Sequence, residues 1–330
     1  MSNAQTAVNA SGEIELKPIS RVAAEAPLRD VMDGAQRMEI KCLDHGFVAL
    51  VDAMPRLVPT GQTADAAIVQ AARVSYGQGT KQVSEDRGLI RYLLRHRHTT
   101  PFEMVEFKFH VAMPIFIARQ WIRHRTANVN EYSARYSIVP DRFYTPSAEA
   151  IRKQSVGNRQ GGEETFAVDG TDPDQAATAT AFLEYLHDAE SQYQKYTALT
   201  QRGVSRELAR MGLPVNVYTE WYWKCDLHNI LRFLSLRMDA HAQLEIREYA
   251  QAMFRLLEPI VPVTMEAWRD YELEAMHLTR AEIQAIREQK NGVAPELATT
   301  NKREAAEWAA KRALLNLRAP EQGETAPIQR

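Results

Sequence analysis

The densest group of side chains that could do chemistry lies between Arg119 and Tyr136, in the sequence RQWIRHRTANVNEYSARY. This segment carries four arginines, a histidine, a glutamate and Ser133. Arg119, Arg123 and Arg125 have little acid near them in the sequence, so they would repel one another unless an anion lies close. A phosphate held by forked guanidinium groups is the economical candidate.

A helix is the element that would present these groups together. Pro114 predicts its start, because the N–H that proline lacks has no partner in a first helical turn. In a helix over residues 114–125, Gln120, Arg123 and His124 share one face. The alternative is a solvated basic helix face. Apolar residues interrupt the charges and favour a largely packed helix; they are Ile115, Phe116, Ile117 and Trp121.

Three stretches of the chain resemble the flavin-dependent thymidylate synthase family. The first is Arg-His-Arg, seven residues and then Ser (RHRTANVNEYS), continued by ARYS and preceded by TPFEMVEFKFHVAMPIFIARQW. The others are ARMGLPVNVYTEWYW and LRMDAHAQLEIREYA, within residues 209–250. The resemblance extends over roughly 75–270 and leaves both ends and an internal insert uncovered.

The resemblance implies reductive methylation of deoxyuridine monophosphate (dUMP) to thymidylate (dTMP). In such a scheme methylenetetrahydrofolate is the carbon donor, NADPH the reductant and FAD the redox carrier. The residues that the resemblance places at dUMP are Gln120, Trp121, Ile122, Arg123, Glu131, Tyr132, Ser133, Ala134, Arg135, Arg210 and Arg237. Ser133, Arg135 and Arg210 would hold the phosphate. Arg237 would be the catalytic residue, ionising the pyrimidine ring.

The same resemblance implies a flavin site and a homotetramer whose active sites draw residues from several chains. The implied flavin contacts are Ser75, Thr100, Glu103, Arg123, His124, Arg125, Glu131, Asp226, Leu227, His228 and Arg232. A helix N-terminus with Arg and His suits a pyrophosphate and an isoalloxazine. The sequence departs from the family at Arg232, where relatives more often carry His or Asn, and more mildly at Asp226. It holds no Gly-x-Gly-x-x-Gly fingerprint, so no Rossmann crevice is expected.

Composition sets limits on partners and compartment. The chain has 330 residues, a formal charge of -2 and two cysteines, which predicts no nucleic-acid or membrane partner, no disulfide framework and a cytoplasmic location. His96, His98, His110 and His124 are close in sequence, but their expected geometry does not suit a metal site. For the thiols, we expect Cys42 among surface residues and Cys225 as a small buried hydrophobe.

The elements that must position these residues follow from periodicity. The alternation of apolar and polar residues over 105–113 predicts a strand. The apolar run over 45–55 and the run rich in aromatic residues over 216–226 predict two more strands. Helices are expected over 65–76, over 175–202, over 204–211 and over 242–257. Ser84 is expected to cap a helix that runs to 97, and Asp226 to cap the helix that follows it. We expect an α/β fold of the α+β type, with a mixed sheet and packed helices. The predicted divisions are a flexible arm at 1–40, a catalytic domain at 41–290 with a surface insert at 149–175, and a charged helical tail at 291–330.

A competing function is a single-stranded nucleic-acid-binding module built on residues 119–136. In that hypothesis Arg123, Arg125 and Arg135 bind the backbone while Trp121, Tyr132 and Tyr136 stack on bases. The balanced overall charge argues against it. A bound flavin would separate the two hypotheses.

Overall fold

The computed structural model describes residues 16–18, 28–32, 35–59, 62–74, 86–155 and 161–320. The chain forms two compact units, Met1–Trp268 and Arg269–Arg330. Every candidate site residue lies in the first unit, and Ser75 lies outside the described residues.

A six-stranded sheet is the centre of the first unit, with the order β2-β3-β4-β6-β10-β7. Its strands are β2 (Leu28–Met32), β3 (Ala35–Cys42), β4 (Gly46–Met54), β6 (Glu106–Pro114), β10 (Tyr218–Asp226) and β7 (Asn128–Glu131). All pairings between these described strands are antiparallel. The α+β class is therefore confirmed, whereas the expected mixture of parallel and antiparallel strands is wrong, because every described pair of neighbouring strands in this sheet runs in opposite directions.

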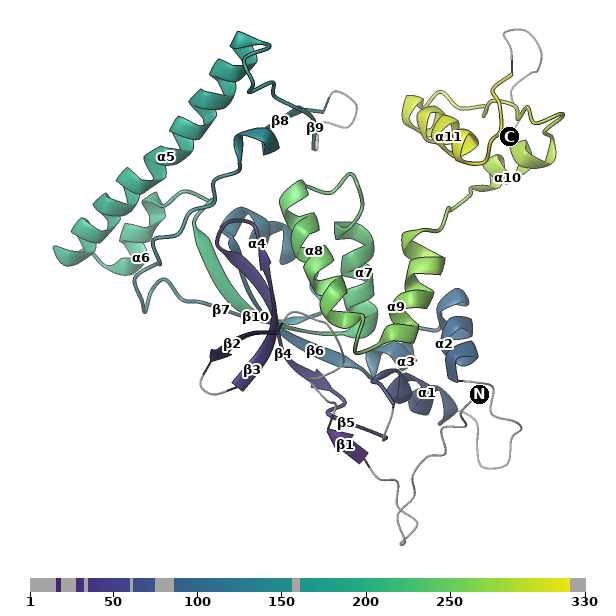
Figure 1. Ribbon diagram of the computed structural model, residues 1–330, viewed down its shortest axis with the longest axis horizontal. Coiled ribbons are helices and arrows are strands. Elements are labelled where there is room, and N and C mark those ends of the chain that lie inside the picture. The colour runs from purple at the N-terminus through teal and green to yellow at the C-terminus, as the bar shows by residue number, and fades with distance from the viewer. Residues whose placement is uncertain are drawn as a thin grey trace, which may run out of the picture. The chain divides into compact units, whose positions relative to one another are not determined.

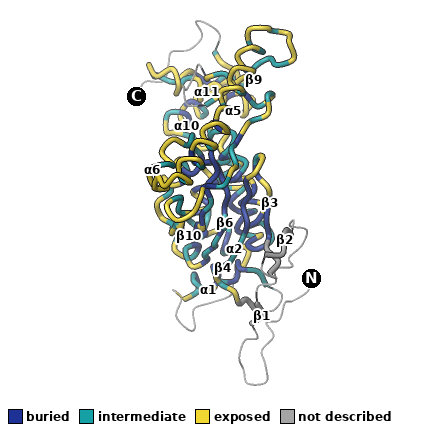
Figure 2. Tube along the Cα trace, turned by 90° about the vertical axis from the view of Figure 1, so that its left-hand side faces the viewer, coloured by how far each residue is buried: buried dark blue, intermediate teal, exposed yellow. Residues whose placement is uncertain are grey.

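The predicted alternation in β6 is confirmed by burial. Phe107, Phe109 and Val111 are fully buried, while Lys108 and His110 on the other side are only partly covered. Trp221 and Trp223 of β10 continue the buried side, which α7 (Leu227–Arg237) and α8 (Leu244–Leu257) cover (Figure 1). Figure 2 shows the buried strands of the sheet in dark blue and the largely exposed α5 (Pro173–Gln201) and α6 (Arg206–Ala209) mostly in yellow. The sheet and these two helices form the platform on which the candidate site is built.

The other described helices of the first unit are α1 (Asp65–Arg73), α2 (Asp86–Arg95), α3 (Thr100–Glu103), α4 (Ile115–Trp121), α5 (Pro173–Gln201), α6 (Arg206–Ala209) and α9 (Pro262–Trp268). Among them, α1, α2, α4, α5 and α6 correspond to predicted helical segments, whereas α3 and α9 were not predicted. Short 3-10 turns lie at Ala148–Ala150 and Arg210–Gly212. Asp172 caps α5 by accepting a hydrogen bond from the Gln175 backbone N–H at 3.2 Å. Ser84, the expected cap of α2, lies outside the described residues.

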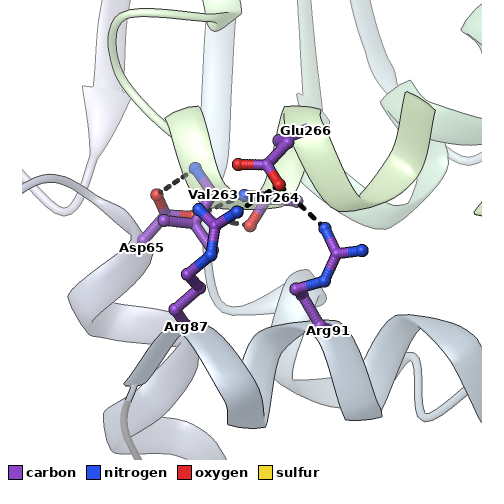
Figure 3. A network of polar contacts seen from close by, with 6 residues as sticks. All are labelled: Asp65, Arg87, Arg91, Val263, Thr264 and Glu266. Carbon is purple, nitrogen blue, oxygen red and sulfur yellow. Dashed lines mark hydrogen bonds and ion pairs between the residues drawn. The ribbon is translucent and has the colours of Figure 1, made fainter. Parts of the chain in front are cut away.

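A buried carboxylate joins α1 to α9, which are almost 200 residues apart in the chain (Figure 3). Asp65 accepts from the backbone N–H groups of Val263 at 2.9 Å and Thr264 at 3.1 Å, and from Thr264 Oγ1 at 2.6 Å. It thereby caps α9 from a distant segment. On the next turn of α9, Glu266 pairs with Arg87 and Arg91 of α2. Burial raises the pKa of Asp65 although these hydrogen bonds lower it.

Several predicted boundaries differ from the structure. Strands β2 and β3 bring residues 28–32 and 35–42 into the main sheet, so part of the predicted arm forms strands. The antiparallel pair of β1 (Leu16–Pro18) and β5 (Leu57–Pro59) forms a separate two-stranded sheet. Cys42 ends β3 and is fully buried, which makes its expected surface position wrong.

The predicted surface insert contains ordered structure of its own. Strands β8 (Arg152–Gln154) and β9 (Gly162–Thr165) pair as a hairpin, and Ile151 and Ser155 are buried. The two hairpin strands are mostly exposed.

The second unit has its own core around Trp308, which is fully buried. It contains a π-helical turn (Arg269–Leu273), α10 (Arg280–Arg287) and α11 (Lys302–Leu314). Thr279 and Glu282 form a capping box at α10, and Lys311 pairs with Glu282 at 2.9 Å. The structural division thus falls after Trp268, and not near residue 290 as the sequence suggested. None of the described helices combines the length and the apolar character needed to cross a membrane.

Candidate functional site

The helix that precedes Arg123, His124 and Arg125 is shorter than predicted. α4 ends at Trp121, and His124 follows in a turn where its backbone N–H donates to Trp121 O at 2.9 Å. The expectation that Gln120, Arg123 and His124 share a helical face is therefore wrong. Gln120 and His124 are nevertheless brought together, because Arg237 contacts both.

Arg237 is the centre of this cluster. Its Nε donates to His124 Nε2 at 3.1 Å and its Nη2 donates to Gln120 O at 3.4 Å. Burial lowers the pKa of this half-buried guanidinium. Within the described part of the chain, no carboxylate forms an ion pair with it. A partly desolvated cation without a counter-charge favours an anionic ligand.

His124 is held neutral beside this cation. Burial lowers the pKa of His124 to about 4, with smaller contributions from the charges of Arg237 and Arg232. Because Nε2 accepts from Arg237, the imidazole proton lies on Nδ1. The ring also meets Phe233 edge-on at a centroid distance of 4.9 Å. His124 therefore orients Arg237 and contributes no second positive charge near pH 7.

The predicted phosphate donors come together on a second part of the unit. Ser133–Tyr136 form a tight turn closed by the Tyr136 N–H to Ser133 O at 3.0 Å. Ala134 of this turn and Ala209, the neighbour of Arg210, pack on the same buried cluster of Val139, Tyr196 and Val217. Three predicted donors thus flank one apolar cluster; they are Ser133, Arg135 and Arg210. Arg135 and Arg210 are exposed and make no ion pair among the described residues.

Glu131 and Tyr132 connect this turn to the sheet. Glu131 ends β7 opposite Trp221 and accepts from Thr219 Oγ1 at 2.8 Å. The Tyr132 N–H donates to Glu220 O at 2.8 Å, and its hydroxyl donates to Ile138 O at 2.8 Å. These contacts fix the chain that leads into the Ser133 turn.

Two other predicted substrate residues differ in accessibility. The Trp121 side chain is fully buried and stacks on Phe233 at a centroid distance of 4.6 Å, so only its main chain could reach a ligand. The Ile122 side chain is exposed. Burial of Trp121 also removes one stacking partner of the nucleic-acid hypothesis.

The remaining predicted flavin residues gather where α3 meets α7. Leu227 N donates to Val105 O at 2.7 Å, which joins the start of α7 to the strand entry after α3, where Thr100 and Glu103 lie. The predicted cap is confirmed, since Asp226 accepts from Asn229 N at 2.9 Å. Leu227 is buried, and His228 is partly covered.

The donor set fits a flavin dinucleotide. Arg123 and Arg125 follow α4, and Arg232 lies on α7; all three are exposed, and within the described ranges none pairs with a carboxylate. Unpaired guanidinium groups beside a helix N-terminus suit a pyrophosphate.

A cavity of about 840 Å³ lies elsewhere, between the β8–β9 hairpin, α5 and the start of α8. Phe116, Tyr144, Gln243 and Arg247 are among its lining residues. Gln243 also accepts a hydrogen bond from the side-chain amide of Gln120. Sequence analysis missed Gln243, because a lone glutamine before an amphipathic helix gives no signal of a contact 123 residues away.

Residues 56–263 match the model of a family described as thymidylate synthase complementing protein. The chain belongs to the flavin-dependent thymidylate synthase family. A flavin-dependent thymidylate synthase of Dictyostelium discoideum is 60% identical over 303 residues, which cover 92% of this chain and 96% of the relative. One from Wolbachia pipientis wMel is 52% identical and covers 76% of this chain and 82% of its own length.

Solved structures agree with this membership. A UMP/dUMP methylase PolB from Streptomyces cacaoi bound with 5-Br UMP superposes with a TM-score of 0.57 at 33% identity, over 71% of this chain and 97% of that protein. The same methylase bound with 5-Br dUMP superposes with a TM-score of 0.57 at 34% identity, over 71% of this chain and 98% of that protein. The chain is therefore an enzyme of a flavin-dependent methyltransferase family. The nucleic-acid-binding hypothesis gains no support.

Proposed function

We propose that this chain methylates dUMP to dTMP, with methylenetetrahydrofolate as carbon donor and NADPH as reductant through bound FAD. The observation that carries the proposal is Arg237, a half-buried guanidinium oriented by neutral His124 and lacking a carboxylate partner among the described residues. Such a group can stabilise negative charge that develops on a pyrimidine ring.

The chain's own residues supply binding and electrostatics in this reaction. Ser133, Arg135 and Arg210 would hold the nucleotide phosphate, and Arg237 would lower the cost of losing the uracil ring proton. Arg123, Arg125 and the start of α7 would bind the flavin pyrophosphate. A bound flavin would supply the reducing equivalents as hydride.

Neither cysteine is set up to add to the pyrimidine ring. Cys42 and Cys225 are both buried, and burial is the largest cause that raises the pKa of each thiol. Asp226 raises the pKa of Cys225 further. A nucleophilic thiolate needs the opposite setting, partly open and electropositive.

We extend the proposal to a cytoplasmic homotetramer with shared active sites. Tyr136 and Met211 are each 74% exposed, and they adjoin Arg135 and Arg210. Large apolar side chains beside a ligand site suit burial by a second copy of the chain.

The direct test is purification of the chain and assay with dUMP, methylenetetrahydrofolate and NADPH. We expect a yellow protein with flavin absorbance that forms dTMP. A folded, flavin-loaded protein that binds no dUMP and forms no dTMP would contradict the proposal.

A further inference from the structure

We infer that Gln243 is a positioning residue that sets which end of the Gln120 amide faces the nucleotide. The inference rests on the proposed function, because it concerns the nucleotide site that Gln120 would line. Neither the family resemblance nor the sequence pattern assigned any role to Gln243.

Gln120 is held at two points of its structure. Its backbone oxygen accepts from Arg237 Nη2 at 3.4 Å, and its side-chain Nε2 donates to Gln243 Oε1. The first contact ties Gln120 to the predicted catalytic arginine. The second uses the donor end of the amide, so the end that remains for a ligand is the carbonyl Oε1.

The remaining amide oxygen has no donor within the described part of the chain. Gln120 is also only partly buried, so the oxygen can be reached by a ligand. Gln120 therefore contacts Arg237 through its backbone oxygen and keeps its amide oxygen as an acceptor for a ligand. If Gln120 turned its amide over, its NH2 group would face the ligand, and a hydrogen-bond donor on the nucleotide would lose its partner.

The side chain of Gln243 has no competing structural duty in α8. The backbone oxygen of Gln243 accepts from Arg247 N at 3.2 Å, while its side chain makes no capping bond to the helix. Gln243 also lines the cavity of about 840 Å³, so a different side chain has room there. Substitution of the side chain should thus change the orientation of Gln120 without loss of the helix.

The shared ligand chemistry is a hydrogen-bond donor on the nucleotide, either the ring N–H or the sugar 3′-hydroxyl. Two analogues distinguish these sources. N3-methyl-dUMP lacks the ring donor, and 2′,3′-dideoxyuridine monophosphate lacks the hydroxyl donor.

The experiment measures nucleotide affinity by calorimetry on the flavin-loaded enzyme and on two variants. Gln243→Leu removes the acceptor that holds Gln120, and we expect dUMP affinity to fall about five- to tenfold. Gln243→Glu keeps an acceptor at the same place, and we expect affinity within about twofold of the unsubstituted enzyme. With one of the two analogues, the difference between Gln243→Leu and the unsubstituted enzyme should disappear, since the donor that Gln120 serves is missing.

Three results would overturn the inference. They are unchanged dUMP affinity in Gln243→Leu, an equal loss in Gln243→Glu, or a loss that persists in full with both analogues. If the unsubstituted enzyme binds flavin but no dUMP, the proposed function falls as well, which distinguishes that failure from failure of the Gln243 role alone.

Discussion

Substitution of Arg237 by lysine separates the charge of this residue from its shape. The guanidinium makes two contacts in different directions, to His124 Nε2 at 3.1 Å and to Gln120 O at 3.4 Å, and keeps further N–H groups for a ligand. A lysine keeps the positive charge but has no planar fork, so it cannot hold both contacts and a ligand in this geometry. Loss of one charge-assisted contact in the transition state costs about 1.5–3 kcal/mol.

That free energy corresponds to a fall in kcat of about 10- to 150-fold for Arg237→Lys. The assay is dTMP formation at saturating dUMP, with flavin content from absorbance and flavin reduction by NADPH followed separately. Both flavin measurements should stay normal. Arg255→Lys, an exposed position on α8, is the matched control and should keep full turnover. Near-normal turnover in fully flavin-loaded Arg237→Lys would refute the assigned role.

Three further predictions concern the phosphate site, pH and the thiols. Arg210→Ala should weaken dUMP binding by about 1.5–3 kcal/mol and leave flavin binding intact; calorimetry showing unchanged dUMP affinity would reject the phosphate assignment. The pKa of His124 is about 4 in the folded chain and 6.5 without its surroundings, so the unfolded state binds the proton more tightly and stability falls as pH drops through this window. The upper limit of this loss in unfolding free energy is about 3.4 kcal/mol, which we reduce to about 1–2 kcal/mol because the ring is partly open to solvent. In urea unfolding, His124→Gln should lose less stability between pH 7 and pH 4 than the unsubstituted chain, and an equal loss of stability would count against this role of His124. The double variant Cys42→Ser, Cys225→Ser should form dTMP at most of the normal rate per folded, flavin-loaded molecule, and complete loss would mean that a cysteine reacts covalently.

Local patterns predicted the elements that form the platform of the site. The alternation in β6 holds because one side of the strand belongs to the sheet face that α7 and α8 cover through β10, β3 and β4, while the other side is only partly covered. This difference imposes a period of two. Asp226 caps α7 as expected, because a carboxylate before a helix satisfies free N–H groups within a few residues. Both features leave a pattern within a few consecutive residues, which is why the sequence alone could predict them.

Features set by distant contacts could not be predicted in the same way. α4 ends at Trp121 although its sequence remains compatible with a helix, because the buried indole packs on Phe233 and the chain then turns toward β7. The hydrogen bond from Arg237 to His124 spans 113 residues, and the one from Gln120 to Gln243 spans 123. No periodicity encodes such pairs. The resemblance named Arg237 and His124 as ligands of different molecules, and their mutual contact came only from the fold.

The central claim is that this chain couples flavin oxidation to methylation of dUMP. The most direct measurement is a single turnover, in which the purified enzyme is reduced anaerobically, freed of excess reductant and mixed with dUMP and methylenetetrahydrofolate. The account predicts that dTMP appears in step with the return of oxidised flavin absorbance and in equal amount. Flavin that stays reduced, or reoxidises without forming dTMP, would contradict it.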